Sequence, residues 1–457
     1  MTIVLSSSTK EAIKVALSIA LAISLAIWFQ WEKPYWAALS VFAMAMTESF
    51  SHSVLKGHNR IFGTILGIGY AFLLVILFSQ DRFLFIFFYG LFMALCLFMS
   101  TDIRRGYIFT MAFSVCSIIA WAGGFDSQHT FNIALLRMQE TVLGVVIFIV
   151  VFRLLWPISS EQTFSELFKQ MHQHMINDTK SLLNAAEHHS STEEIDLRQL
   201  IASLNNFLNN PTKDSYQLTF HKALWKKRLL DFAIIHHYLR QIQVDSEKEI
   251  NTTLLNEILV ALEEFTPQTP EYFVLPDFLQ AYRDEVPLPT IETRSFTQHW
   301  KDDRRKVAHG VTMYIVGIYM WIYMSIPGSF MFPMILSIFA CILPTMPTIL
   351  IKDMLCSIIG FGIFYSFQYI TIMPMMTEIW QLIAFYFINI LVVWKVFSTP
   401  KLMIYRLLGG NLLLIMTMGA LNLIPKYDIS TTIDMLTIIV LVLMMGRFFG
   451  DLFKKQF

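Results

Sequence analysis

Charged residues are scarce along most of this 457-residue chain. They make up 15% of the sequence, and 38 of the 68 fall between residues 158 and 306. The residues before and after that segment form two long apolar stretches that are interrupted only by short polar breaks. A set of soluble domains of this total length would carry more surface charge. The composition therefore predicts a membrane protein with one polar insertion.

The motifs of several enzyme classes are also missing. No GxxxxGK[ST] loop, GxSxG elbow or HExxH helix occurs, which argues against an ATP-driven pump in one chain and against a membrane hydrolase. The net charge is zero and the pI is about 7.2, so nothing indicates binding to nucleic acid. The sequence predicts a protein that is not an enzyme, with no metal and no cofactor. The few cysteines all lie in apolar segments, which indicates buried thiols and not a disulfide framework: Cys96, Cys116, Cys341 and Cys356.

Long apolar runs recur through both apolar stretches. A helix needs roughly 20 residues to cross a bilayer, and backbone groups in lipid must be hydrogen-bonded within the segment. The alternation with period two that a membrane β-barrel needs is absent. The fold class predicted is thus all-α and polytopic, with about twelve transmembrane helices near 13–30, 35–50, 61–79, 83–100, 106–123, 134–156, 308–325, 329–349, 354–371, 379–397, 403–424 and 431–449.

The polar insertion repeats apolar residues at a spacing of three to four positions, which indicates helices. Three domains follow: an N-terminal six-helix membrane region at 1–157, a helical domain at 158–306 and a C-terminal six-helix membrane region at 307–457. Lysine and arginine concentrate in the loops on one side of the predicted spans. By the positive-inside rule this places both termini and the helical domain in the cytoplasm.

The two apolar stretches resemble each other. A shift of 293 residues sets Trp28 over Trp321 and Gly67 over Gly360, and a shift of 294 sets Arg153 over Arg447. Since six spans is an even number, both copies would have the same topology, related by an axis along the membrane normal. The sequence therefore predicts two parallel six-helix repeats, with a pathway between them.

Ionisable residues inside a membrane helix are costly, so each is a functional candidate. Arg137 and Glu140 lie three residues apart in the sixth predicted span, on one helix face. The shift of 294 sets Glu140 over Asp434. We expect these two carboxylates to carry protons or to gate an anion, with Arg137 as an anion contact. The alternative is an ordinary salt bridge near a helix end.

Other ionisable residues lie at the predicted inner ends of the spans. Glu48 is a further candidate for carrying protons. The candidates for contact with an anion or for gating are Arg60, Lys352, Arg104 and Arg105, of which the last two fit a cytoplasmic loop equally well. Small residues near Arg60 and in the shifted copy predict close helix packing of the small-xxx-small kind: Gly63, Thr64, Gly67, Ser357 and Gly360.

Three segments taken together resemble the fusaric acid resistance (FUSC) family of inner-membrane proteins. They are KPYWAALSVFAM (33–44), RIFGTILGIGY (60–70) and RMQETVLGVVIFIVVFRLLWP (137–157). That family includes the bacterial aromatic acid exporters and is distantly akin to plant aluminium-activated malate transporters. The residues that match its Arg-x-x-Gly-Thr-x-x-Gly and Pro-Tyr-Trp stretches are Arg60, Gly63, Thr64, Gly67, Pro34, Tyr35 and Trp36.

The resemblance implies a secondary transporter of the bacterial inner membrane that exports small organic or aromatic acid anions, driven by protons. It also implies a periplasmic membrane-fusion adaptor and an outer-membrane channel as partners, besides the substrate and membrane lipid. Two alternatives stay open, a passive anion channel between the halves and an envelope scaffold that transports nothing. Substrate identity and association into a homo-oligomer are open as well.

Overall fold

The computed structural model divides the chain into two compact units. Residues 1–48, 52–157 and 295–457 form one, here called the membrane unit, and residues 49–51 and 158–294 form the other, the central unit. The central unit ends at residue 294, earlier than the predicted 306. The reason is that the charged stretch 301–306 is part of a helix of the membrane unit, Phe296–Tyr323. The structure describes residues 6–45, 50–102, 105–124, 126–157, 160–183, 197–209, 218, 220–244, 252–265, 273–283, 286–288, 296–324, 326 and 328–455.

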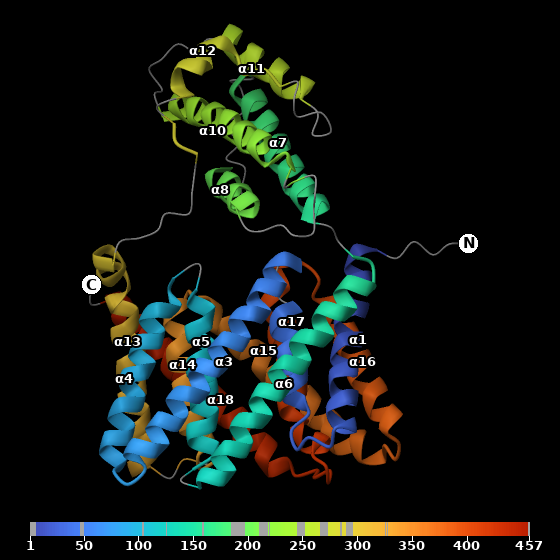
Figure 1. Ribbon diagram of the computed structural model, residues 1–457, viewed down its shortest axis with the longest axis vertical. Coiled ribbons are helices and arrows are strands. Elements are labelled where there is room, and N and C mark those ends of the chain that lie inside the picture. Colours follow the sequence, from blue (N-terminus) through green and yellow to red (C-terminus); the bar gives the residue numbers. More distant parts are fainter. Residues whose placement is uncertain are drawn as a thin grey trace. The chain divides into compact units, whose positions relative to one another are not determined.

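The described secondary-structure elements of the membrane unit are helices joined by short loops (Figure 1). Among its described residues, seven helices are long and apolar enough to cross a membrane, and four further apolar helices are shorter, such as α2 and α5. The expectation of an all-helical polytopic membrane protein is thereby confirmed for the described part of the chain. Its first half contains α1 (Ser7–Trp28), α2 (Tyr35–Ala45), α3 (Phe50–Phe78), α4 (Arg82–Ser100), α5 (Gly106–Ala122) and α6 (Ser127–Leu154). The second half contains α13 (Phe296–Tyr323), α14 (Met331–Ile342), α15 (Leu350–Thr371), α16 (Ile379–Val396), α17 (Met403–Met416) and α18 (Ile429–Lys455).

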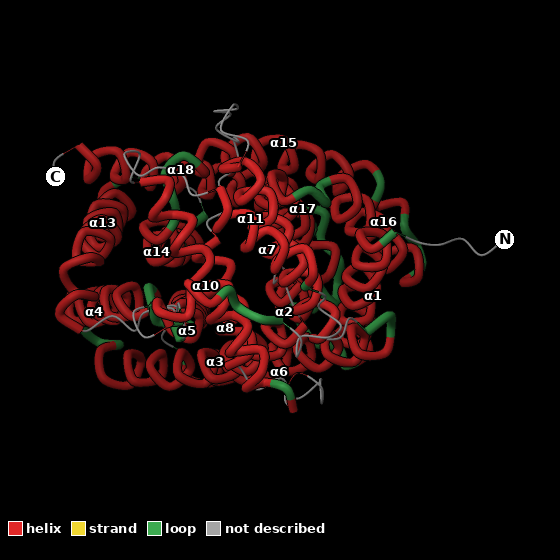
Figure 2. Tube along the Cα trace, turned by 90° about the horizontal axis from the view of Figure 1, so that it is seen from above, coloured by secondary structure: helices red, strands yellow, loops and turns green. Residues whose placement is uncertain are grey.

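Helices from the two halves pack side by side in pairs. α1 packs on α16 and α4 on α13, while α2 packs on α17 and α5 on α14. Figure 2 shows the α1/α16 and α4/α13 pairs on opposite sides of the membrane unit. Within each half, α2 packs on α6 and α14 on α18. The short helices α2 and α14 therefore each contact both halves.

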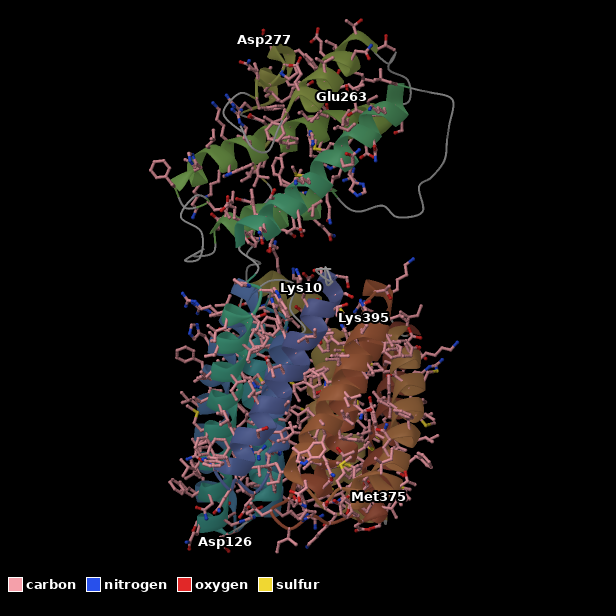
Figure 3. The ribbon with its side chains drawn as sticks, turned by 90° about the vertical axis from the view of Figure 1, so that its right-hand side faces the viewer. Lys10, Asp126, Glu263, Asp277, Met375 and Lys395 are labelled. Carbon is pink, nitrogen blue, oxygen red and sulfur yellow. The ribbon has the colours of Figure 1, made fainter. Side chains whose placement is uncertain are left out.

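The two ends of the membrane unit differ in charge. Lys10 and Lys395 mark one end, whereas Asp126 and Met375 mark the other (Figure 3). At the second end Asp81 and Asp126 cap α4 and α6, each accepting two backbone N–H bonds at the helix start. Carboxylates are favoured at helix N-termini, where the helix dipole is positive. The capping aspartates thus fix where two of the membrane helices begin.

Two of the predicted packing glycines bring α3 against α5. A Cβ atom on Gly67 would lie 2.3 Å from the Ala112 carbonyl oxygen, and one on Gly63 would lie 2.6 Å from that of Ile108. The Thr64 hydroxyl between them bonds the Arg60 carbonyl of its own helix at 2.8 Å. Backbones can approach this closely only where side chains are small.

The shifted copy does not repeat this contact. Ser357 is buried, but no described atom lies within 4 Å of a Cβ built on Gly360, so the expected packing is not present there. Instead the next residue, Phe361, lies against Gly409 of α17. In the second half the glycine at the contact is thus on α17, and the residue of α15 that faces it is a phenylalanine.

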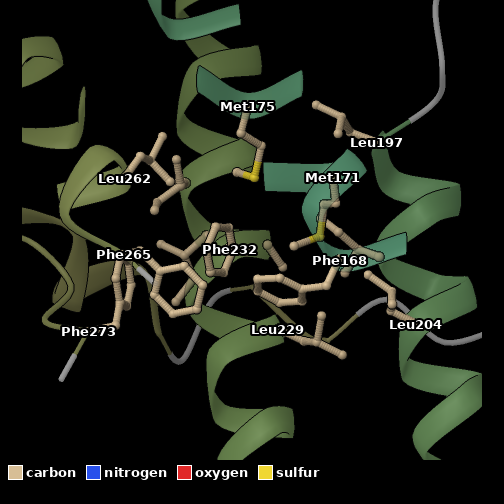
Figure 4. Packing of buried hydrophobic residues seen from close by; sticks show 14 of the residues in the cluster. Phe168, Met171, Met175, Leu197, Leu204, Leu229, Phe232, Leu262, Phe265 and Phe273 are labelled. Carbon is tan, nitrogen blue, oxygen red and sulfur yellow. The ribbon is translucent and has the colours of Figure 1, made fainter. Parts of the chain in front are cut away.

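The central unit consists of α7 (Ser160–Leu183), α8 (Leu197–Asn209), α10 (Lys222–Val244), α11 (Thr252–Glu264), α12 (Asp277–Gln280) and the 3₁₀ turn η2 (Ala281–Arg283). Its core is rich in phenylalanine, and Phe168 and Phe232 lie among leucine and methionine side chains (Figure 4). The buried Asp231 carboxylate is paired with Arg228 and Arg283. These features give the unit its own hydrophobic core.

The α3/α5 contact generates a prediction about two neighbouring glycines. Gly67→Ala should lower the free energy of unfolding by about 1–3 kcal/mol, because the new methyl group meets backbone atoms of α5 that must move. Gly69 is the matched control, since nothing lies within 4 Å of its Cβ position. Gly69→Ala should be neutral or stabilising by up to about 1 kcal/mol through helix propensity. Unfolding of the detergent-purified protein in SDS measures both, and equal losses would contradict the assignment.

Candidate functional site

An ion pair lies in the middle of α6. Arg137 and Glu140 occupy the central turns of this 28-residue helix, and Glu140 is about 20 Å along the axis from Ser127 at a rise of 1.5 Å per residue. The Arg137 Nη2 atom lies 2.7 Å from Glu140 Oε2. The pair therefore lies away from both ends of the helix.

Both side chains of this pair are almost fully buried. The Arg137 side chain is 5% exposed and that of Glu140 is 1% exposed. Within the described residues, Nε and Nη1 of Arg137 and Oε1 of Glu140 make no hydrogen bond. A guanidinium group carries five N–H donors, so Arg137 has donors to spare for a further acceptor. Buried charges that are only partly satisfied are costly in an apolar environment and usually serve a function.

The partner of Arg137 on the neighbouring helix is an indole ring. The Cζ atom of Arg137 lies 4.3 Å from the centre of the Trp36 ring, which is the geometry of a cation–π contact. The close approach of α2 and α6 depends on Gly144, since a Cβ atom there would lie 2.6 Å from the Ala37 carbonyl oxygen. Trp36, the last residue of the Pro-Tyr-Trp stretch, thus faces the buried arginine.

A lysine lies next to this cluster in the turn before α2. Burial lowers the pKa of the Lys33 ammonium, and the positive charge of Arg137 lowers this pKa further. Glu32 and Glu140 act on Lys33 in the opposite direction. A second cation thus lies beside Arg137, with Glu32 and Glu140 as the nearby negative charges.

Asp434 does not join the Arg137 cluster in this structure. It lies in the second turn of α18, is partly exposed, and forms no ion pair or hydrogen bond with a described residue. The position three residues before it is Thr431, where Arg137 stands relative to Glu140. The second half thus has a carboxylate at the shifted position without the arginine.

Of the candidates near the Lys10/Lys395 end, Arg60 contacts side chains of α5. Arg60 is half-buried, and its Nη1 atom donates to the Tyr107 hydroxyl at 3.0 Å and lies 2.9 Å from the Met111 sulfur. The Lys56 ammonium lies 5.1 Å from the centre of the Tyr107 ring. Arg60 therefore faces α5 together with a second cation. Lys352 and Arg105 are exposed, and Glu48 and Arg104 lie outside the described residues.

Lys14 is a buried cation whose position the sequence did not reveal. Its side chain is almost fully buried, its Nζ atom donates to the carbonyl oxygen of Trp156, and it lies 5.3 Å from the Phe152 ring centre. Trp156 has a φ of 39°, a left-handed conformation that is rare outside glycine. In the sequence, Lys14 is a lysine near the start of an apolar helix. This pattern is also that of an interfacial lysine whose ammonium group reaches water, so it does not indicate burial.

A comparison with known protein families matches residues 11–249 to the model of the fusaric acid resistance protein family, abbreviated FUSC. The match covers just over half of the chain and includes Trp36, Arg60, Arg137 and Glu140. A search of curated proteins finds no match.

The buried ion pair makes a prediction about stability. Arg137→Met should cost about 3–5 kcal/mol because it leaves Glu140 buried without a partner, and Glu140→Leu should do the same to Arg137. The double variant should cost less than either single one. Arg447→Met is the control, because its pair with Asp451 is exposed and 3.9 Å long, so it should change stability by less than about 0.5 kcal/mol. Additive losses in SDS unfolding would show that the two charges do not depend on each other.

Proposed function

The chain belongs to the fusaric acid resistance protein family, and on that premise we propose that it is an inner-membrane secondary transporter that exports small organic or aromatic acid anions in a proton-coupled way. The family and the apolar helices give it a role in membrane transport or resistance. The substrate class, the coupling and a periplasmic adaptor that works with an outer-membrane channel are parts of the proposal.

The observation that carries the proposal is the buried pair of Arg137 and Glu140. A transporter of carboxylates needs a cation within the membrane that can bind the anion, and Arg137 has unused donors there. Proton coupling needs a titratable group next to that cation, and Glu140 is 2.7 Å away. An anion at Arg137 and a proton on Glu140 would each change the electrostatic environment of the other. One pair of residues thereby supplies both requirements.

Helix packing supports a proposed arrangement as two parallel six-helix repeats. Suppose that α1–α6 correspond in order to α13–α18. Exchanging each helix for its counterpart then turns the pair α1/α16 into α13/α4, and the pair α2/α17 into α14/α5. All four pairs occur, as a two-fold relation between the halves requires. Within the halves, α2/α6 likewise becomes α14/α18. The seam between the halves is therefore the proposed pathway.

The charge at the two ends supports an orientation with both termini in the cytoplasm. The Lys10/Lys395 end carries most of the lysine and arginine, and aspartates cap helices at the other end. The positive-inside rule assigns the basic end to the cytoplasm.

This orientation can be tested by labelling single cysteines with a membrane-impermeant maleimide in intact spheroplasts. Gln128→Cys and Thr399→Cys place exposed thiols at opposite ends, in a background in which the exposed Cys356 is replaced by serine. Gln128→Cys should react before lysis, whereas Thr399→Cys should react only after it. The reverse order would overturn the proposed topology.

Transport in proteoliposomes tests the function. With benzoate as substrate, Glu140→Gln should lower the pH-dependent part of the flux at least about tenfold. The substitution removes the carboxyl group that takes up a proton and replaces its charged contact with Arg137 by a weaker, uncharged one. Asp434→Asn should have a smaller effect because Asp434 is partly exposed and unpaired among the described residues. Asp451→Asn, an exposed acid of the same helix, serves as the control.

Three results would count against the proposal in different ways. Wild-type pH dependence in both Glu140→Gln and Asp434→Asn would remove the carboxylates from the mechanism. Steady unitary currents in planar bilayers would favour a passive channel. No flux for any member of a panel of aromatic and aliphatic acids would contradict transport of organic anions altogether.

A further inference from the structure

A second arginine lies on a tryptophan ring at the seam between the two halves. Arg406 is in the first turn of α17, and its Cζ atom lies 4.9 Å from the centre of the Trp394 ring of α16. Trp394 is 1% exposed, and its indole N–H donates to Glu11 Oε1 of α1 at 3.0 Å. Helices from both halves therefore meet at one arginine, one tryptophan and one glutamate.

The guanidinium of Arg406 is poorly paired. Its side chain is 14% exposed, and its closest contact with a carboxylate, from Nη1 to Glu11 Oε1, is 4.0 Å. That oxygen already accepts the hydrogen bond from Trp394. The Nε atom of Arg406 is buried and makes no hydrogen bond in the described part of the chain. The buried Nε–H group therefore lacks an acceptor, and a carboxylate bound to Nε and a neighbouring Nη atom would supply one.

The comparison with Arg137 shows what differs between the two clusters. Both consist of an arginine over a tryptophan ring with a glutamate beside it. At Arg137 the glutamate is 2.7 Å away and the arginine is 5% exposed, whereas at Arg406 the distance is 4.0 Å and the exposure 14%. The Arg137 cluster is closed by its own carboxylate. In the Arg406 cluster the glutamate lies farther from the guanidinium, which leaves room for another acceptor.

Lysines lie near Arg406 at this end of the membrane unit. Lys10 precedes Glu11 along α1. Lys395 follows Trp394, and its ammonium group is bound by the hydroxyls of Ser6, Ser8 and Thr9 at 3.0, 2.9 and 2.7 Å. Since hydroxyls bind the ammonium without neutralising it, the local charge stays positive. Such a field attracts anions to this end of the membrane unit.

We infer that Arg406, held by Trp394 at the seam of α1, α16 and α17, forms a second binding site for a small organic carboxylate. The site rests on the proposed transport function, in which it takes up the anion from the basic end before the anion reaches Arg137. The carboxylate binds the free donors of Arg406, and Glu11 keeps its bond to Trp394. No covalent or proton-transfer step is needed at this site.

Helix α2 links the two arginine clusters physically. Trp36 contacts Arg137, and Phe42, six residues later in α2, packs edge-on against Trp394 with ring centres 5.2 Å apart. Gly410 of α17 lies beneath the same phenylalanine, where a Cβ atom would clash with the ring. The two sites are therefore in contact with opposite parts of one short helix, about 9 Å apart along its axis.

Equilibrium dialysis of radiolabelled benzoate against the full-length protein in nanodiscs tests the inference. The wild-type protein should bind two benzoate ions per chain, and benzamide, which has no charge, should compete with neither. Arg406→Gln should remove one site or weaken it at least about tenfold, as expected for the loss of a charge-assisted hydrogen bond. Arg137→Gln should remove the other, and the double variant should bind none.

Matched variants separate a binding role from a structural one. Arg406→Lys keeps the charge and should retain weakened binding, which also covers the case that Arg406→Gln does not fold. Arg447→Gln, an exposed arginine with a loose partner, should bind as the wild type does. Unchanged stoichiometry in folded Arg406→Gln, or only one site in the wild type, would overturn the inference.

The outcome for this site can be told apart from that for the proposed function. Two bound benzoate ions without any flux in proteoliposomes would support the site and contradict transport. Flux in Arg406→Gln equal to that of the wild type, with one bound benzoate in both, would support transport and contradict the site.

Discussion

The ion pair between Arg137 and Glu140 sets the requirements that the surrounding helices meet. Two charges in the middle of a membrane helix are stable only if they lie against each other and are shielded from lipid. Glu140 satisfies the first requirement by its i,i+3 spacing, and α2 satisfies the second by covering the arginine with the Trp36 ring. The pair remains incomplete, because Arg137 still has donors without acceptors. This residual demand for an acceptor is the reason why we propose the pair as an anion site.

Helix α2 reaches this position because it is short and closely packed. With 11 residues it is too short to cross a bilayer as an isolated helix. It is instead enclosed by α1, α6 and α17, with a glycine at the closest approach on each of the last two, Gly144 and Gly410. Gly144 lets the α2 backbone approach α6, and Gly410 makes room for the Phe42 ring, as Gly409 does for Phe361.

Much of the helical layout could be predicted from the sequence, because apolar runs of membrane length have one favourable backbone structure in lipid. The Arg137–Glu140 pair was also predictable, since residues three apart on a helix share a face. The contact with Trp36 was not, because it joins residues about 100 positions apart and depends on how closely α2 and α6 approach. Arg406 could have been found as a cation inside an apolar span, but its partners come from α1 and α16. Gly360 shows that a sequence match alone can mislead. It matches Gly67 in the shifted sequence, but no neighbouring helix lies against it as α5 lies against Gly67.

The two arginine clusters differ in a way that suits successive steps of one process. A site that meets the anion first should be accessible and loosely paired, so that binding does not require a strong ion pair to break. The distance of 4.0 Å between Arg406 and Glu11 meets this condition. A site deeper in the membrane should be closed when empty, because an uncompensated arginine there would be too costly. The distance of 2.7 Å between Arg137 and Glu140 meets that one. An anion that took the place of Glu140 at Arg137 would therefore have to break a close ion pair, whereas an anion at Arg406 would not.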